Sequence, residues 1–161
     1  MGIYLNPDSS KFEEAVNSDI YVDKTGLLTY TNSVLHTMQK YICISRPRRF
    51  GKSTAANMLT AYYSRGCDAE QIFSQFEIAK DSGFKKYLNK YNTISVNMQE
   101  ILSRSRSIYE LIERFNKLLI RDLKKEYPDV DYFDDTDVIE CMQDVYSQKK
   151  QAFIVILDEW D

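Results

Sequence analysis

Six consecutive apolar residues at positions 152–157 constrain the fold of this chain more than any other feature. The run reads Ala-Phe-Ile-Val-Ile-Leu, so a strand formed from it needs cover on both faces. Strands in the middle of a parallel sheet have such an environment. Two more strands are predicted, at residues 40–45 (KYICIS) and 93–98 (TISVNM). The first is another nearly continuous apolar run and is expected to be buried, Cys43 included.

Helical patterns separate these strands. Capping boxes, in which a serine is followed three residues later by a glutamate, predict helices that begin near Ser10 and Ser107. Further helices are expected at residues 24–39, 51–65, 82–89 and 135–149. Because strands and helices alternate along the chain, the sequence predicts an α/β fold.

Composition narrows the class of protein. The 161 residues, 43% hydrophobic and 28% charged, suit one globular domain, and a net charge of −3 argues against nucleic-acid binding through overall charge. Three cysteines without a Cys-x-x-Cys pair and a single histidine, His36, argue against a disulfide framework or a zinc site. With no export signal and no run long enough to cross a bilayer, we expect a cytoplasmic protein without a membrane partner.

The segment 46–54, RPRRFGKST, lies between a predicted strand and a predicted helix. In the phosphate-binding pattern G-x-x-x-x-G-K-[S/T], a helix N-terminus surrounds a phosphate, the lysine adds charge and the hydroxyl ligates Mg²⁺. Gly51, Lys52 and Ser53 match its second half, whereas Arg46 stands where the first glycine belongs. Taken alone, the tripeptide also fits an ordinary helix N-terminus.

Two adjacent carboxylates, Asp158 and Glu159, follow the apolar run at its carboxyl end. This is the Walker B arrangement, in which the aspartate holds the Mg²⁺ shell and the glutamate activates the attacking water. Ligands of parallel sheets bind at the carboxyl ends of the strands, where the Lys52 loop should also lie. The alternative is a pair of surface acids after a buried strand. Together, the two motifs favour binding of nucleotide phosphates.

Three strings resemble the signature blocks of the AAA-ATPase-like domain family: YVDKTG at 21–26, SRPRRFGKS at 45–53 and LDEWD at 157–161. The resemblance extends over essentially the whole chain, including residues 73–98. An arginine in place of the first glycine, here Arg46, is in keeping with that family. Its members are abundant in gut bacteria and often carry a PD-(D/E)XK-type nuclease-like domain further along the chain.

The resemblance implies a P-loop NTPase-like, three-layer αβα fold with a mainly parallel sheet, with Walker A at 46–53 and Walker B at 153–159. It implies that ATP and Mg²⁺ bind, that Lys52 and Glu159 act catalytically, and that Ser53 and Asp158 hold the metal. The block at 21–26 is expected to pack beside the loop, near the base or ribose. The residues expected to bind the nucleotide are Arg48, Arg49, Phe50, Gly51, Lys52, Ser53 and Thr54.

The sequence stops at Asp161, directly after the expected Walker B strand. The resemblance implies more sheet beyond it, so residues 1–161 are expected to be the N-terminal part of an ATPase domain, truncated, with weak or no hydrolysis unaided. Two alternatives stay open. One is a non-catalytic protein-interaction or inhibitor module that uses exposed sheet edges, which also invite self-association, and the acidic surface at 129–140. The other binds nucleic acid through Arg46, Arg48 and Arg49, helped by Arg104.

The acidic segment 129–140 mimics a calcium loop at several positions. Phe133 and Asp134, however, occupy positions where that motif needs a ligand and a glycine. Acids also gather at helix N-termini, and Asp137 and Glu140 would then lie at the start of the next helix. The pattern therefore predicts a helix start in preference to a metal site.

Overall fold

The computed structural model describes residues 2–45 and 51–160, and the structural statements below concern these residues. Mostly short helices fill the first half of the chain, and the longest helix lies between the two strands. In chain order the elements are α1 Ser10–Val16, α2 Gly26–Val34, α3 Lys52–Tyr63, α4 Glu70–Phe73, the 3-10 helix η1 Glu77–Lys80, α5 Phe84–Tyr87, β1 Asn92–Asn97, α6 Met98–Leu102, α7 Ile108–Glu126, α8 Val138–Lys149 and β2 Phe153–Asp158.

The sheet consists of β1 and β2, which pair in parallel from Asn92↔Phe153 to Asn97↔Asp158. Helices α6, α7 and α8 connect the two strands, as a parallel pair requires. On β1, Leu5 forms an antiparallel bridge with Ile94. The predicted mixed α/β character is therefore confirmed.

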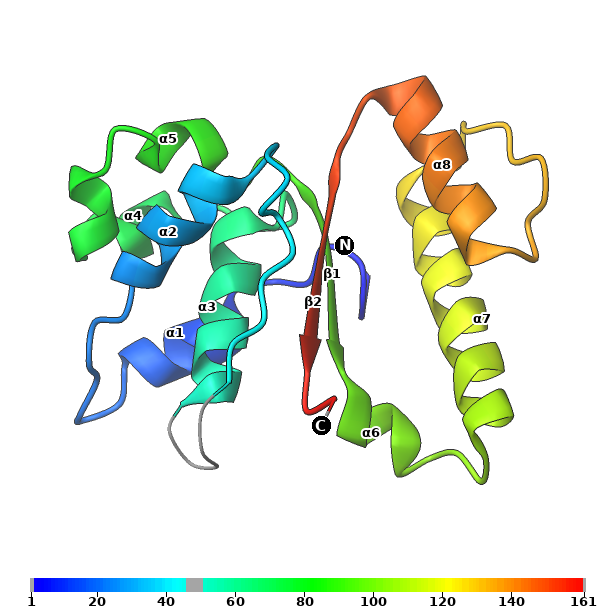
Figure 1. The fold of residues 1–161 in the computed structure, drawn as a ribbon, viewed down its shortest axis with the longest axis horizontal. Coiled ribbons are helices and arrows are strands. Elements are labelled where there is room, and N and C mark those ends of the chain that lie inside the picture. The colour runs from blue at the N-terminus through cyan, green and yellow to red at the C-terminus, as the bar shows by residue number, and fades with distance from the viewer. Residues whose placement is uncertain (1, 46–50, 161) are drawn as a thin grey trace.

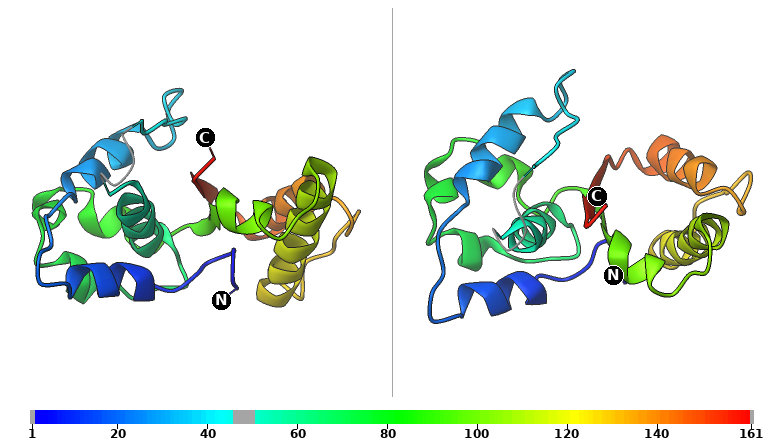
Figure 2. Two further views of the ribbon diagram at one scale, coloured as in Figure 1. Left: turned by 90° about the horizontal axis from the view of Figure 1, so that it is seen from below. Right: turned by 60° about the horizontal axis from the view of Figure 1, so that its bottom comes forward.

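Helices lie on both sides of this sheet, α1 to α5 on one side and α6 to α8 on the other (Figure 1). Figure 2 shows the same separation from two further directions, with α7 and α8 side by side. Each side has its own apolar core. Ile94 and Val96 of β1 pack with Leu123 of α7, while Phe12 and Tyr62 belong to the cluster on the α3 side.

The two predicted capping boxes have different outcomes. At α7 the Ser107 side chain accepts a hydrogen bond from the Glu110 N–H at 3.2 Å, so the predicted start is confirmed. At α1 the N-cap is Ser9, whose side chain makes no capping bond. Helix α1 does begin at Ser10, as predicted, but the capping box is wrong because Asp8 Oδ1 accepts both the Ser10 N–H and the Ser10 hydroxyl.

Residues 40–45 are not the buried strand that their apolar character predicts. They form no strand within the described ranges, and Tyr41 and Cys43 are exposed, Tyr41 to 85%. An apolar run becomes a buried strand only when a neighbouring strand and a covering layer are available. Here β2 pairs with β1, and residues 40–45 are not part of that sheet.

Burial of the apolar run at β2 is incomplete on one of its two faces. Ile156 is buried, whereas Val155 and Leu157 are about half exposed, at 52% and 50%. Side chains alternate along a strand, and α3 packs against β2. On the opposite side, the buried residues of α7 and α8 cluster with Ile94 and Val96 of β1. The expected cover on both faces is therefore wrong for the part of the chain that the structure describes.

Candidate functional site

The expected phosphate-binding and carboxylate residues lie at one end of the sheet. Helix α3 begins at Lys52, and β2 ends at Asp158. The N-terminal end of α3 and the carboxyl ends of both strands lie at the same end of the molecule (Figure 1). Helix α3 also packs directly against β1 and β2. Segments about a hundred residues apart are thus brought to the place where parallel sheets bind ligands.

Gly51 starts α3 in a left-handed conformation, with φ 77° and ψ 28°. Glycine adopts this conformation without the steric cost of a Cβ atom. The Gly51 carbonyl accepts the Ala55 N–H at 3.0 Å, which begins the helix. Gly51 has no side chain that could cap the helix, and the N–H groups of a helix's first turn are donors of the kind that anions bind. Ser53, in that turn, is exposed.

A second lysine, Lys24, reaches this helix start. A methyl group built on Gly51 would come within 2.5 Å of Lys24 Nζ. Lys24 belongs to the YVDKTG block, and the motifs of the sequence predict no contact for its side chain. The signal that could have found it is a lysine flanked by Asp23 and Thr25, two residues that commonly fix turns.

The end of β2 turns sharply. Glu159 has a positive φ of 54°, which is uncommon for a residue with a Cβ atom. Its backbone N–H donates to Asp158 Oδ1 at 3.0 Å. Both carboxylates are partly buried at the carboxyl end of the strand. Backbone strain of this kind is common at functional sites.

The structure describes only some of the other expected site residues. Arg46, Arg48, Arg49 and Phe50 lie outside the described residues. Thr54 lies in the first turn of α3, partly buried. Arg104, named for a nucleic-acid surface, forms an ion pair with Glu100 on α6 at 3.4 Å.

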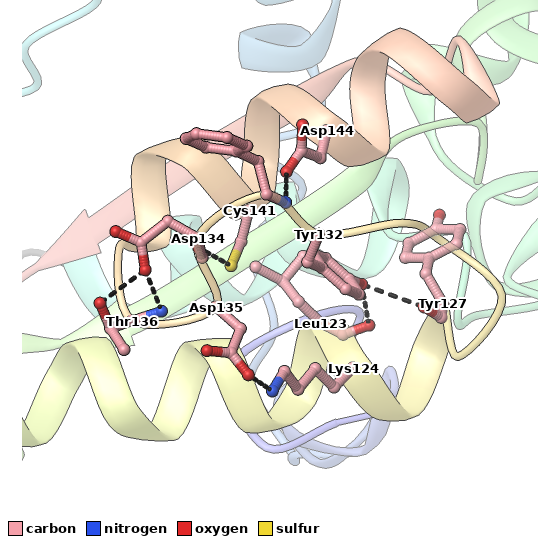
Figure 3. Close-up of polar contacts among 10 residues, drawn as sticks. Leu123, Lys124, Tyr127, Tyr132, Asp134, Asp135, Thr136, Cys141 and Asp144 are labelled. Atoms are coloured by element: carbon pink, nitrogen blue, oxygen red, sulfur yellow. Dashed lines mark hydrogen bonds and ion pairs between the residues drawn. The ribbon is translucent and has the colours of Figure 1, made fainter.

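The acidic segment before α8 is organised as a helix start. Asp137 is the N-cap of α8 and accepts the N–H groups of Ile139 and Glu140 at 2.8 and 3.1 Å. Figure 3 shows how two neighbouring acids are held before the helix, with Asp134 bonded to Thr136 and Asp135 paired with Lys124 of α7. The two hydrogen bonds from Thr136 lower the pKa of Asp134. The predicted helix start is confirmed.

Metal ligands are sparse in the described part of the chain. Across residues 2–45 and 51–160, no group of three or more His, Cys, Asp or Glu side chains is arranged to hold a metal ion. A cation at this site would therefore need oxygen atoms from its ligand as well. In the same ranges, no helix combines the length and apolar character that crossing a membrane requires.

Two surface hollows lie elsewhere on the molecule. One, of about 260 Å³, is lined by residues of α1, α3 and β1, among them Lys11, Asn57 and Ser95. The other, of about 680 Å³, runs along α7 beside Lys117 and Arg121. Neither hollow includes the first turn of α3, so they are separate from the candidate site.

The parallel strands with helices on both sides define a mixed α/β protein. Within this class, the chain belongs to the predicted AAA-ATPase family, whose family model matches residues 9–161. Among curated proteins and solved structures, no significant match is found. The family assignment therefore rests on the family model, and it confirms the resemblance that the three sequence blocks indicated.

Proposed function

We propose that this chain is an ATP-binding module with a P-loop NTPase-like αβα fold. The observation that carries the proposal is the shared position of two sequence motifs. Gly51-Lys52-Ser53 starts α3, and Asp158-Glu159 ends β2, at the same end of the sheet. Membership of the predicted AAA-ATPase family supports nucleotide use at this site.

The first turn of α3 would bind the phosphates. Its backbone N–H groups and the positive end of the helix dipole attract anions. Lys52 supplies a full positive charge for the β- and γ-phosphates. Arg48, Arg49, Phe50 and Thr54 belong to the proposed binding loop through their match to the family's motif.

Mg²⁺ suits the oxygen donors present at this position. The Ser53 hydroxyl and the Asp158 carboxylate are hard ligands, and Mg²⁺ commonly takes one or two protein oxygens together with phosphate oxygens and water. The requirement for few protein ligands agrees with the sparse set of donors in the described residues. Glu159 would accept a proton from a water molecule that attacks the γ-phosphate.

Thermal unfolding with and without MgATP tests the proposal. Nucleotide at about a hundred times its dissociation constant stabilises a folded protein by roughly 2.7 kcal/mol, which corresponds to a rise in Tm of about 5–10 °C at this chain length. Lys52→Ala should lose this rise because the phosphates lose their principal cation. Lys117→Ala, at an exposed lysine of α7, is the matched control and should keep it.

Two results would contradict ATP binding at this site. One is a cooperatively folded parent protein whose Tm is unchanged by MgATP. The other is a rise in Tm that is as large in Lys52→Ala as in the parent. Glu159→Gln separates binding from turnover, because it should keep the rise while abolishing any release of phosphate.

A further inference from the structure

Lys24 has no part in the phosphate-binding motif, yet its ammonium group lies against the residue that starts α3. We propose that Lys24 is a second phosphate-binding lysine and that it contacts the polyphosphate of a nucleoside di- or triphosphate. This inference rests on the proposed nucleotide site and extends it. Its primary observation is the approach of Lys24 Nζ to Gly51, where a methyl group would come within 2.5 Å.

The residues on either side of Lys24 are fixed in place. Asp23 Oδ1 accepts the Thr25 N–H at 2.8 Å and the Thr25 hydroxyl at 2.7 Å, while Asp23 Oδ2 accepts the Glu77 N–H at 2.9 Å. Thr25 is fully buried, and its Oγ1 accepts the Ile78 N–H at 3.2 Å. Lys24 is therefore held between two residues that are anchored to η1.

The anchoring depends on an ionised carboxylate. Partial burial raises the pKa of Asp23, but the hydrogen bonds from Thr25 and from the Glu77 N–H outweigh it, so this pKa lies below its ordinary value. Asp23 consequently carries its charge at neutral pH. Its role is to position the turn that presents Lys24.

Tyr21 anchors the beginning of the same block. Its ring lies 6.0 Å from that of Phe12 and 5.3 Å from that of Phe76. Burial, with a smaller contribution from the nearby charge of Asp23, raises the pKa of Tyr21 to about 12. The block at 21–25 is thus packed against the α1–α5 side, and the Lys24 side chain extends from it toward α3.

The charge at this position favours an anionic ligand. A cation at a helix N-terminus is repelled by the positive end of the helix dipole, and Lys52 adds another positive charge in the first turn. A polyphosphate carries several negative charges, so one ligand of this kind can contact both lysines and the N–H groups together. The chemistry therefore points to the phosphates, and not to the base or the ribose, as the part of the ligand that Lys24 contacts.

Affinity measurements with two ligands test this assignment. Dissociation constants for MgATP and for magnesium tripolyphosphate are measured by calorimetry for the parent, Lys24→Met and Lys24→Arg. We expect Lys24→Met to weaken both ligands by a similar factor of about ten, the scale of one lost charge-assisted hydrogen bond. Lys24→Arg should stay within about threefold of the parent because it keeps the charge. Lys117→Met serves as the matched control.

The outcomes separate this proposal from the one on which it rests. If Lys24→Met weakens MgATP but leaves tripolyphosphate unchanged, Lys24 contacts the nucleoside and the proposal is wrong. It is equally wrong if Lys52→Ala abolishes binding while Lys24→Met binds like the parent. A fall in the ligand-free Tm of Lys24→Met, with no recovery in Lys24→Arg, would identify a purely structural role. A folded parent that binds neither ligand would overturn both proposals.

Discussion

At the scale of single residues, a buried carboxylate joins the N-terminal segment to α7. Asp122 is only 2% exposed, and its Oδ2 accepts the backbone N–H groups of Tyr4 and Leu5 at 2.9 and 3.3 Å. Arg121 lies 3.3 Å from the other oxygen. Gly2 packs against the same group, since a Cβ atom there would come within 2.5 Å of Asp122 Oδ2. One side chain thus holds the segment that pairs with β1.

Asp122→Ala should lower the free energy of unfolding by about 2–4 kcal/mol, because two buried N–H groups lose their acceptor. Urea unfolding followed by circular dichroism measures the change. Arg121→Ala is the control; its side chain is 42% exposed, so a loss below about 1 kcal/mol is expected. Equal losses in the two variants would show that the ion pair, and not the backbone contacts, accounts for the effect.

Neither Asp122 nor Lys24 could be assigned its contacts from the sequence. The Asp122 contact joins residues 118 positions apart in the sequence, and a local sequence pattern cannot predict a contact over such a separation. Lys52, Ser53 and Asp158 could be found because short motifs carry their chemistry. Lys24 stood in a recognised block, but only the packing of that block against η1 directs its side chain to Gly51.

At the scale of elements, the features with local causes could be predicted. Helices α7 and α8 have side-chain caps and apolar periodicity, and β1 and β2 each lie within one residue of the expected bounds. Residues 40–45 have the same apolar character but lack a strand to pair with. The short elements α4 and η1 were not foreseen because contacts from distant residues, such as Thr25 with Ile78, hold them.

The exposed position of residues 40–45 can be checked through their cysteine. At pH 8, Ellman's reagent should modify Cys43 rapidly in the native protein because this thiol is exposed. Cys67 should react slowly, because burial raises its pKa to about 11, and buried Cys141 should react only after unfolding. Cys43→Ser should remove the fast phase. If Cys43→Ser still reacts rapidly with Ellman's reagent, the fast reaction does not come from Cys43, and the exposed position of this residue is contradicted.

At the scale of the whole molecule, the two cores differ in polarity. The core on the α7 and α8 side is mainly aliphatic, whereas the one around α3 includes Tyr62, Tyr63 and Tyr91. The Tyr63 hydroxyl donates to Asn32 Oδ1 at 2.7 Å, and that of Tyr62 donates to the Phe84 carbonyl at 2.8 Å. Neutral phenols are thus part of the packing between α2, α3 and α5.

The buried phenols predict a loss of stability in alkali. Burial raises the pKa of Tyr62 to about 12 and that of Tyr63 even more, from an ordinary value of 10. The stabilisation that these two neutral phenols contribute is complete below pH 10, which is their pKa in the unfolded chain. It is lost as the pH rises toward their higher pKa values in the folded protein. For Tyr62 the loss between pH 10 and 12 is on the order of 2–3 kcal/mol.

Urea unfolding at a series of pH values from 8 to 12 measures this loss. Tyr62→Phe should be less stable at pH 8, since its hydrogen bonds are gone, but should show a shallower fall above pH 10. Tyr109→Phe is the control because that side chain is 87% exposed, and its profile should match the parent. If the free energy of unfolding falls equally steeply with pH in Tyr62→Phe and in the parent, ionisation of Tyr62 is not the cause of the alkaline loss.

The parallel pairing of β1 with β2 also determines the order in which the molecule can fold. The paired residues are about 60 positions apart, so the sheet must close a long loop before it gains any ladder hydrogen bonds. The contact between α7 and α8, which run in the same direction, closes a much shorter one (Figure 1). Because local contacts form first, this pair of helices should pack before the sheet forms, and the end of the chain that carries Asp158 should be among the last parts to reach its native position.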